Sequence, residues 1–218
     1  MSTPVYLVEY SDVAAEAGAR NTIGGSPVLP AGESWPECFC GSRMVLFFQF
    51  DIPADIPVFG GNHLLAFQCR HHDDVPFVES GPQLPDAFWD GPTNPGYPGP
   101  FWRLMLHRDE TGPVGDTEKT FSARVLTLSA GSDGSADGDY WPLFKVGGEP
   151  DWVQSPESPR CPCGADMVFV CQVPESYGFS DEHEPYADDY MIFLGNAVYV
   201  LACPVRCHPA AVWPVPQN

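Results

Sequence analysis

A stretch of this chain occurs twice, and this repeat limits the possible folds more than any other feature. Residues 23–50 and 146–173 match without a gap at a constant offset of 123 positions (146 minus 23). Each copy holds a Gly-Gly turn, a proline-rich loop, a Cys-x-Cys-Gly motif and then an apolar run. Similarity at a fixed spacing indicates a repeated structural module. The matching pairs are Gly24/Gly147, Gly25/Gly148, Pro27/Pro150, Pro36/Pro159, Cys38/Cys161, Cys40/Cys163, Gly41/Gly164, Met44/Met167, Val45/Val168 and Gln49/Gln172.

The repeat predicts two β-rich lobes, related by pseudo-symmetry and packed as one body. The first lobe spans 1–130 with its core motif at 23–73, and the second spans 131–218 with its core motif at 146–207. The chain has 25 Pro and 21 Gly but no Gly-x-y period, so a collagen-like fold is excluded. Short apolar runs between turn residues are typical of an all-β protein. We therefore expect a mainly β fold with little helix.

The expected elements follow from these runs. Asp12–Arg20 is predicted to form one or two helical turns, and Gly131–Asp139 has the composition of a linker. Residues 75–100 form a long Pro- and Gly-rich loop, and 176–189 is an acidic insertion. Met191–Cys203 is expected as two short strands, or as one strand bent at Gly195-Asn196. The other predicted strands are Val5–Tyr10, Met44–Ile52, His63–Cys69, Phe101–His107, Lys119–Leu128, Met167–Pro174 and Val212–Val215.

The charge balance restricts the partners. The formal net charge is −19, from 10 Lys and Arg against 29 Asp and Glu. A nucleic-acid-binding protein needs a basic stripe against the phosphates, and this sequence has none. We therefore expect no nucleic-acid or membrane partner, and attraction to basic proteins or peptides. The alternative is that the acidity only keeps the protein soluble.

The first residues contain neither a basic segment nor an apolar segment of the kind found in signal peptides. The sequence also has no run of about 18 apolar residues, the length that a transmembrane helix needs. We therefore expect a cytoplasmic protein whose thiols are reduced. In that compartment, paired cysteines point to metal binding rather than to disulfides.

The second copy contains a predicted zinc site. Cys161 and Cys163 form one close pair, and Cys203 and Cys207 form another after the intervening β-segments. Four thiols in two pairs have the composition of a closed structural zinc site. The usual spacing in such sites is Cys-x2-Cys, whereas here the pairs are Cys-x-Cys and Cys-x3-Cys. Buried or reactive thiols without a metal are the alternative.

The first copy offers a variant of this site. It supplies Cys38 and Cys40, and Cys69 aligns with Cys203. We favour His72 as the fourth ligand because a ring nitrogen suits zinc better than a carboxylate. His71 and Asp73 are the alternatives, and a site that has lost its metal is another. Cys171 lies within a strand and is predicted to be a packed core thiol.

Other patterns favour binding over catalysis. No nucleophile elbow, phosphate-binding loop or His-Glu-x-x-His helix is present. The run Asp181–Glu184 is expected to be a solvated loop rather than a catalytic pair. A group of aromatic residues around Pro-Gly turns can line a groove for an extended peptide, or cover the core from outside. This group is Trp89, Tyr97, Phe101 and Trp102.

The Gly-Gly, Cys-x-Cys-Gly and terminal Cys motifs together resemble those of the programmed cell death protein 2 superfamily, which includes the bacterial YwqG-like proteins. Residues 23–51 with 64–69 look like the first half of that family, and 159–173 with 197–217 like its second half. The resemblance implies a duplicated β-rich fold with structural zinc at the cysteine motifs. It also implies protein binding. The eukaryotic members look like chaperones for a basic ribosomal protein, and bacterial members are proposed peptide or protein binders, some near immunity systems.

Three functions follow as hypotheses. The first, which we favour, is a cytosolic, zinc-stabilised, non-catalytic module that binds a basic protein or peptide, either as a chaperone or as an immunity-type protein. The second is a metal-dependent hydrolase that uses the site of three cysteines and one histidine in the first copy. The third is a thiol or zinc redox sensor.

Overall fold

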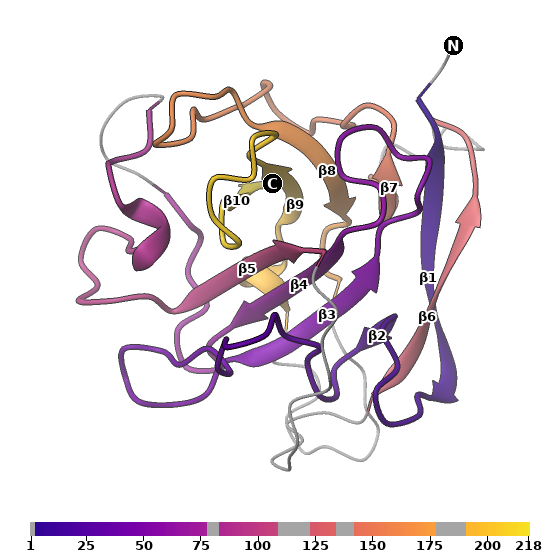
Figure 1. The fold of residues 1–218 in the computed structure, drawn as a ribbon, viewed down its shortest axis with the longest axis horizontal. Coiled ribbons are helices and arrows are strands. Elements are labelled where there is room, and N and C mark those ends of the chain that lie inside the picture. The colour runs from indigo at the N-terminus through magenta and orange to yellow at the C-terminus, as the bar shows by residue number, and fades with distance from the viewer. Residues whose placement is uncertain (1–2, 78–82, 109–122, 134–141, 178–190) are drawn as a thin grey trace.

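Ten antiparallel strands form one sheet in the part of the chain that the structure describes. The structure is a computed structural model, and it describes residues 3–77, 83–108, 123–133, 142–177 and 191–218. Figure 1 shows the sheet curling into a barrel-like body. Helix is limited there to short 3-10 segments, which include η1 (Phe88–Asp90) and η3 (Ile192–Gly195). The mainly β fold with little helix is therefore confirmed. The strands are β1 (Val5–Ala14), β2 (Thr22–Ile23), β3 (Val45–Asp51), β4 (His63–Gln68), β5 (Trp102–His107), β6 (Arg124–Ala130), β7 (Lys145–Gly147), β8 (Val168–Val173), β9 (Ala197–Ala202) and β10 (Val212–Gln217).

The order of the strands is symmetric about the centre of the sheet. It reads β10-β9-β8-β7-β1-β6-β2-β3-β4-β5. The central strand β1 pairs with β6, where Val8 faces Leu128, and with β7, where Val5 faces Gly147. On its other side, β6 pairs with β2. The strands of the second predicted lobe, β7–β10, are thus joined through β1 to the strands of the first lobe, and the two predicted lobes share one continuous sheet.

The two copies of the repeat form the same local hydrogen bonds. The side chain of Gln49 accepts a bond from the backbone N–H of Val28 at 2.8 Å. Gln172 accepts the equivalent bond from Asp151, 123 positions after Val28 (151 minus 28), at 2.9 Å. Both glutamines are fully buried, so each one anchors a proline-rich loop onto the sheet. These correspondences agree with an internal repeat, while duplication itself stays a prediction.

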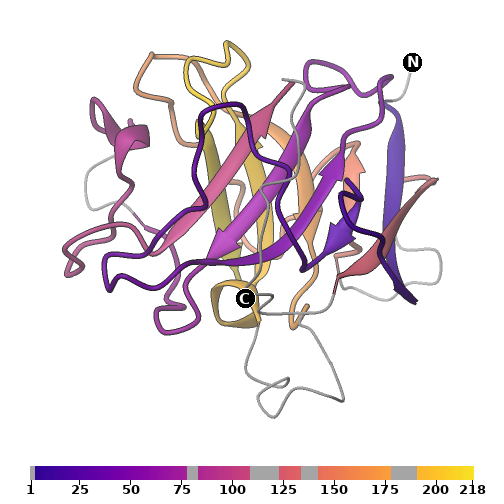
Figure 2. The same cartoon turned by 60° about the horizontal axis from the view of Figure 1, so that its bottom comes forward.

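The inner strands are buried on both faces. Every residue of β4 and β9 is buried, and only the last residue of β3 is partly exposed. Such strands read as continuous apolar runs, which is why β3, β4 and β9 have little polar alternation. Figure 2 shows β3–β5 crossing in front of β8–β10, so the two ends of the sheet enclose a shared core.

Aromatic packing holds the edge strands near each other. The rings of Trp102 in β5 and Trp213 in β10 have centroids 5.7 Å apart in an edge-to-face arrangement. The backbone N–H of Leu106 in β5 donates to the carbonyl of Pro209, just before β10, at 2.8 Å. These contacts join the two edges of the curled sheet.

Two expectations about local structure are corrected. The predicted helical turns at Asp12–Arg20 are absent, and β1 continues to Ala14 because Ala14 still pairs with Arg124 of β6. A turn follows at 17–18. In Met191–Cys203, the first part is the 3-10 segment η3, and one strand, β9, begins only after Gly195, whose φ is 75°. In the first case, pairing with β6 outweighs the local helical preference of Ala and Glu.

Some predicted segments lie outside the described residues. These are 119–122 of a predicted strand, 134–139 of the linker, and 178–189 of the acidic insertion, including Asp181–Glu184. Among the helices of the described residues, none has both the length and the apolar character needed to cross a lipid bilayer.

Candidate metal centres

Each Cys-x-Cys-Gly motif forms a tight knuckle before a strand. In the first copy the N–H of Gly41 donates to the carbonyl of Cys38 at 2.8 Å, and in the second the N–H of Gly164 donates to the carbonyl of Cys161 at 2.8 Å. Both glycines have positive φ, 83° and 89°, a conformation that side chains disfavour. The Gly in the motif therefore closes the turn that carries both thiols.

The antiparallel strands bring the remaining ligands to each knuckle. The first knuckle precedes β3, and Cys69 directly follows β4, which pairs with β3. The second knuckle precedes β8, and Cys203 directly follows β9, which pairs with β8. The start of one strand lies beside the end of its antiparallel neighbour, so residues far apart in sequence meet at one end of the sheet.

The first cluster contains Cys38, Cys40, Cys69 and His72, whose ligand atoms all lie within 4.8 Å of one another. The Nδ1 atom of His72 is 3.5 Å from Cys38 Sγ and 3.6 Å from Cys69 Sγ. The sulfur atoms of Cys40 and Cys69 are 3.8 Å apart. Of the three residues considered for the fourth ligand, His72 is the one grouped with the cysteines.

The neighbours of His72 have other contacts. The backbone N–H of His71 donates to Cys69 Sγ at 3.3 Å. Asp73 is exposed. The ring of Phe39 packs against the His72 ring at a centroid distance of 4.4 Å, which restricts the orientation of the imidazole.

The second cluster contains four cysteines, Cys161, Cys163, Cys203 and Cys207, again within 4.8 Å of one another. Cys161 Sγ lies 3.4 Å from Cys207 Sγ, and Cys163 Sγ lies 3.6 Å from Cys203 Sγ. Cys207 reaches the cluster through a turn in which the N–H of Arg206 donates to the Cys203 carbonyl at 3.0 Å.

The donor atoms of both clusters fit a tetrahedral metal ion. With metal–sulfur bonds of about 2.3 Å, the sulfur atoms of a tetrahedral site lie ~3.8 Å apart. The closest contacts in the two clusters are 3.4–3.8 Å, near this value. Either cluster could therefore hold a metal ion with little movement of its side chains.

Within each knuckle, one thiol is buried and the other exposed, and their pKa values shift in opposite directions. Burial raises the pKa of Cys38 to about 12, whereas hydrogen bonds from the side chain and backbone of Ser42 lower the pKa of Cys40 to about 7. In the second knuckle burial raises the pKa of Cys161, and the backbone N–H of Ala165 lowers the pKa of Cys163. A bound cation would favour the thiolate form of all of these ligands.

Residues 83–89, from the first half of the chain, form hydrogen bonds with the second knuckle. The indole N–H of Trp89 donates to Cys161 Sγ at 3.2 Å. The side-chain amide of Gln83 donates to the carbonyl of Cys161, and Leu84 N–H donates to the carbonyl of Arg160 at 2.9 Å. The sequence pattern did not reveal this support, since it offered no signal that joins residues 83–89 to the second knuckle.

Three of the four aromatic residues predicted to line a peptide groove lie in the core. The exposed fractions are 0% for Phe101, 1% for Trp102 and 4% for Trp89. Tyr97 is half-buried and packs on Phe101. Trp89 in η1, Trp102 in β5 and Phe101, just before β5, therefore fill the interior rather than line a groove. Cys171 is fully buried and outside both clusters, which agrees with the predicted core thiol.

Neither the protein-family models nor the curated proteins match this chain.

Proposed function

We propose that this chain is a non-catalytic, zinc-stabilised module that binds basic protein segments. The observation that carries the proposal is the pair of four-ligand clusters, each of which joins a knuckle to the end of a neighbouring strand. A site with four protein ligands leaves no coordination position for a substrate, which is the usual arrangement of structural zinc. The proposal agrees with the resemblance to the programmed cell death protein 2 superfamily.

Zinc is the metal that best suits these donors. Soft thiolates select zinc, copper(I) or iron–sulfur clusters, and a tetrahedral set of four thiolates, or of three thiolates and one imidazole, is typical of zinc. In the first site Cys38, Cys40, Cys69 and His72 would hold the ion, and in the second Cys161, Cys163, Cys203 and Cys207. Bound zinc would supply the positive charge that keeps the buried thiols ionised, and it would tie each knuckle to the end of a neighbouring strand.

The partner class is inferred from charge. With a net charge of −19, the protein attracts cationic polypeptides at long range and repels nucleic acid. Such attraction mainly accelerates encounter and selects the sign of the partner. We therefore propose a basic, extended segment of another protein as the ligand, and a chaperone-like or immunity-type role for the complex.

Elemental analysis of protein purified without added metal tests the zinc part of this proposal. We expect two zinc ions per chain in the wild type and one in Cys203→Ser. The matched control is Cys171→Ala, which removes a buried thiol outside both clusters and should keep two ions. Less than one zinc ion per wild-type chain, or no loss in Cys203→Ser, would contradict the assignment.

A further inference from the structure

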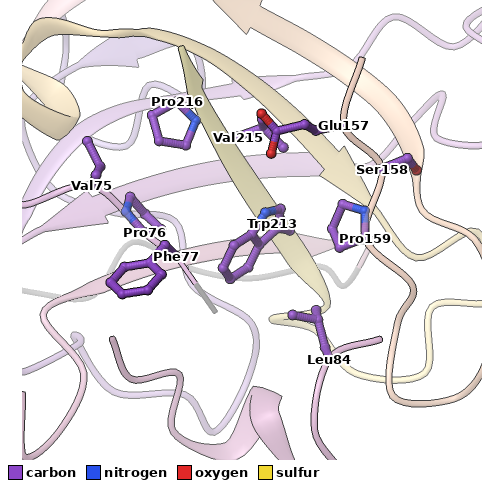
Figure 3. A pocket seen from close by; sticks show the side chains of 10 residues that line it. All are labelled: Val75, Pro76, Phe77, Leu84, Glu157, Ser158, Pro159, Trp213, Val215 and Pro216. Carbon is purple, nitrogen blue, oxygen red and sulfur yellow. The ribbon is translucent and has the colours of Figure 1, made fainter. Parts of the chain in front are cut away.

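A pocket of about 430 Å³ lies on β10, between two loops that lead to or from the metal clusters. Figure 3 shows residues 75–77 on one side of Trp213, and Glu157 and Pro159 on the other. The first wall begins three residues after His72, and the second ends two residues before Cys161. Leu84 closes one end and is held by its bond to the backbone of Arg160.

The surface of this pocket is mostly apolar. Pro76, Phe77, Leu84, Pro159 and Trp213 are among its lining residues. Phe77 is 45% exposed, which is high for a side chain of its size, while Leu84 and Trp213 form a buried floor. Pockets with these dimensions and this composition are typical of sites that accept one side chain or a small ligand.

The polar groups of the pocket favour a cation. Within the described part of the chain, its lining contains one ionisable side chain, Glu157, which is exposed and accepts a bond from the neutral amide of Gln217 at 3.3 Å. The other polar side chain, Ser158, donates its hydroxyl to the carbonyl of Met167 at 3.0 Å. The nearest cation along the chain, Arg160, is paired with Asp166 at 3.0 Å. Among the described residues, the carboxylate of Glu157 therefore has no cationic partner.

We infer that this pocket binds an arginine side chain from an extended basic segment. The aliphatic stem would lie between Phe77 and Pro159, and the guanidinium would pair with Glu157. The planar guanidinium suits this site because it stacks on apolar rings and pairs with carboxylates in a fixed geometry. The inference rests on the proposed function. Zinc bound at the two clusters would hold the loops that form the pocket walls, since these loops lie within three residues of His72 and Cys161.

The test is a titration of the zinc-loaded full chain, monitored by NMR of its Leu and Val methyl groups. The probes are a flexible peptide of Gly, Ser and Arg and two counterparts in which citrulline or norleucine replaces Arg. We expect the Arg peptide to shift the methyl signals of Val75, Leu84 and Val215. The citrulline peptide keeps the shape of Arg without its charge, and we expect it to bind at least about tenfold more weakly.

Variants assign the binding to the pocket. Glu157→Gln should weaken the Arg peptide about three- to fivefold, the range of a partly exposed ion pair. Glu9→Gln makes the same change of charge on an exposed position of β1 and should leave the affinity within about 1.5-fold. Phe77→Ala removes one wall at an exposed position and should weaken binding about threefold with zinc content unchanged.

Different results separate the two proposals. The Arg peptide can bind while Glu157→Gln and Glu9→Gln have the same affinity for it, or while the methyl shifts occur outside the pocket. In either case the pocket assignment is wrong and the proposed function stands. If the norleucine peptide binds as tightly as the Arg peptide, the pocket is an apolar site and the inference that it recognises a cation is wrong. If no basic peptide binds, both the pocket and the partner class are wrong, while the zinc content of the same samples still tests the metal sites.

Discussion

The sulfur atom of Cys161 has a hydrogen-bond donor that is absent from the motif itself. Trp89 Nε1 lies 3.2 Å from this sulfur, and both residues are buried. An N–H···S bond stabilises a thiolate and fixes its direction, so it would raise the affinity of this cluster for a metal ion although Trp89 is not one of the four ligands.

Trp89→Phe removes this donor and keeps an aromatic ring. We expect the affinity of the second site for Co²⁺ to fall about five- to tenfold, with a shift of the sulfur-to-cobalt charge-transfer band. Competition with a chelator measures the affinity. Trp102→Phe is the matched control, since the indole N–H of Trp102 is buried without a hydrogen-bond partner among the described residues. If the two variants bind cobalt equally, Trp89 is only a packing residue.

Asp51 makes the stability of the fold depend on pH in the acidic range. Burial tends to raise the pKa of Asp51, but hydrogen bonds from His63 and Arg20 outweigh it, so the pKa lies well below its usual value. His63 Nδ1 is 2.9 Å from the carboxylate, and Arg20 Nη2 is 2.7 Å from it. The folded state therefore binds fewer protons at this group than the unfolded chain.

Asp51→Asn should lower the free energy of unfolding by about 1–2 kcal/mol at pH 7, allowing for the partial exposure of the ion pair. The contribution of Asp51 is complete above about pH 5, and it is lost as the pH falls below about 4, the unfolded pKa. Urea denaturation of wild type and variant at several pH values measures the difference. A difference that stays constant down to about pH 2 would contradict this origin.

At the residue scale, the sequence was sufficient to predict the core thiol, but not Trp89. Cys171 lies inside an apolar run, so its burial follows from the pattern. The Trp89 contact joins residues 72 positions apart through an irregular loop, and no periodicity reports such a contact. For the same reason, Phe101 and Trp102 could not be assigned to the core rather than to a groove.

Among the elements, the proline-rich loops depend on buried amides rather than on regular structure. Gln49 accepts from Val28 and donates to the carbonyls of Ala19 and Ser26 and to the hydroxyl of Thr22. A proline-rich loop has few N–H donors of its own, so one buried side chain serves several of its backbone groups.

Gln49→Ala and Gln172→Ala should each lower the free energy of unfolding by about 2–4 kcal/mol, because each removes a fully buried side chain that bonds at least two backbone groups. Gln154→Ala is the control, since Gln154 is exposed and its side-chain amide donates to the carbonyl of Asn218; the substitution should cost less than about 0.5 kcal/mol. Denaturant titration measures the free energy of unfolding of each variant. A small effect at both buried positions would mean that water replaces these bonds.

Strand positions were predictable where burial is nearly continuous, as in β3, β4 and β5, because a long apolar run between turns has few other solutions. The segment after Tyr10 was not predictable. Its Ala- and Glu-rich sequence favours helix locally, and only the partner strand β6 keeps it extended. The pairing of β1 with β7 likewise depends on residues from the other half of the chain.

At the scale of the molecule, the net charge should control how strongly basic peptides bind. With a net charge of −19, we expect the affinity for a basic peptide to fall at least about tenfold between about 50 and 300 mM salt, because the screening length shortens across this range. The citrulline peptide should show little salt dependence. Isothermal titration calorimetry at several salt concentrations makes the comparison. Equal slopes for both peptides would argue against electrostatic recognition.

The shared sheet also predicts how fragments behave. Residues 1–133 lack the strand that pairs with β1 on one side, and residues 142–218 lack β1 itself. Expressed alone, each fragment should aggregate or remain unfolded, and expressed together they should form an equimolar complex with the far-ultraviolet spectrum of the intact chain. Independent folding of either fragment would mean that the β1–β7 pairing contributes little.

The position of β1 has a consequence for synthesis on the ribosome. This strand leaves the exit tunnel before the strands that follow it in the sheet, yet Val5 pairs with Gly147. At about 5–20 residues per second, its partner follows roughly 7–28 s later. For that time β1 exposes an unpaired edge to every other nascent chain nearby. A factor that covers the N-terminal strand during translation should therefore raise the yield of folded protein more than one that acts after release.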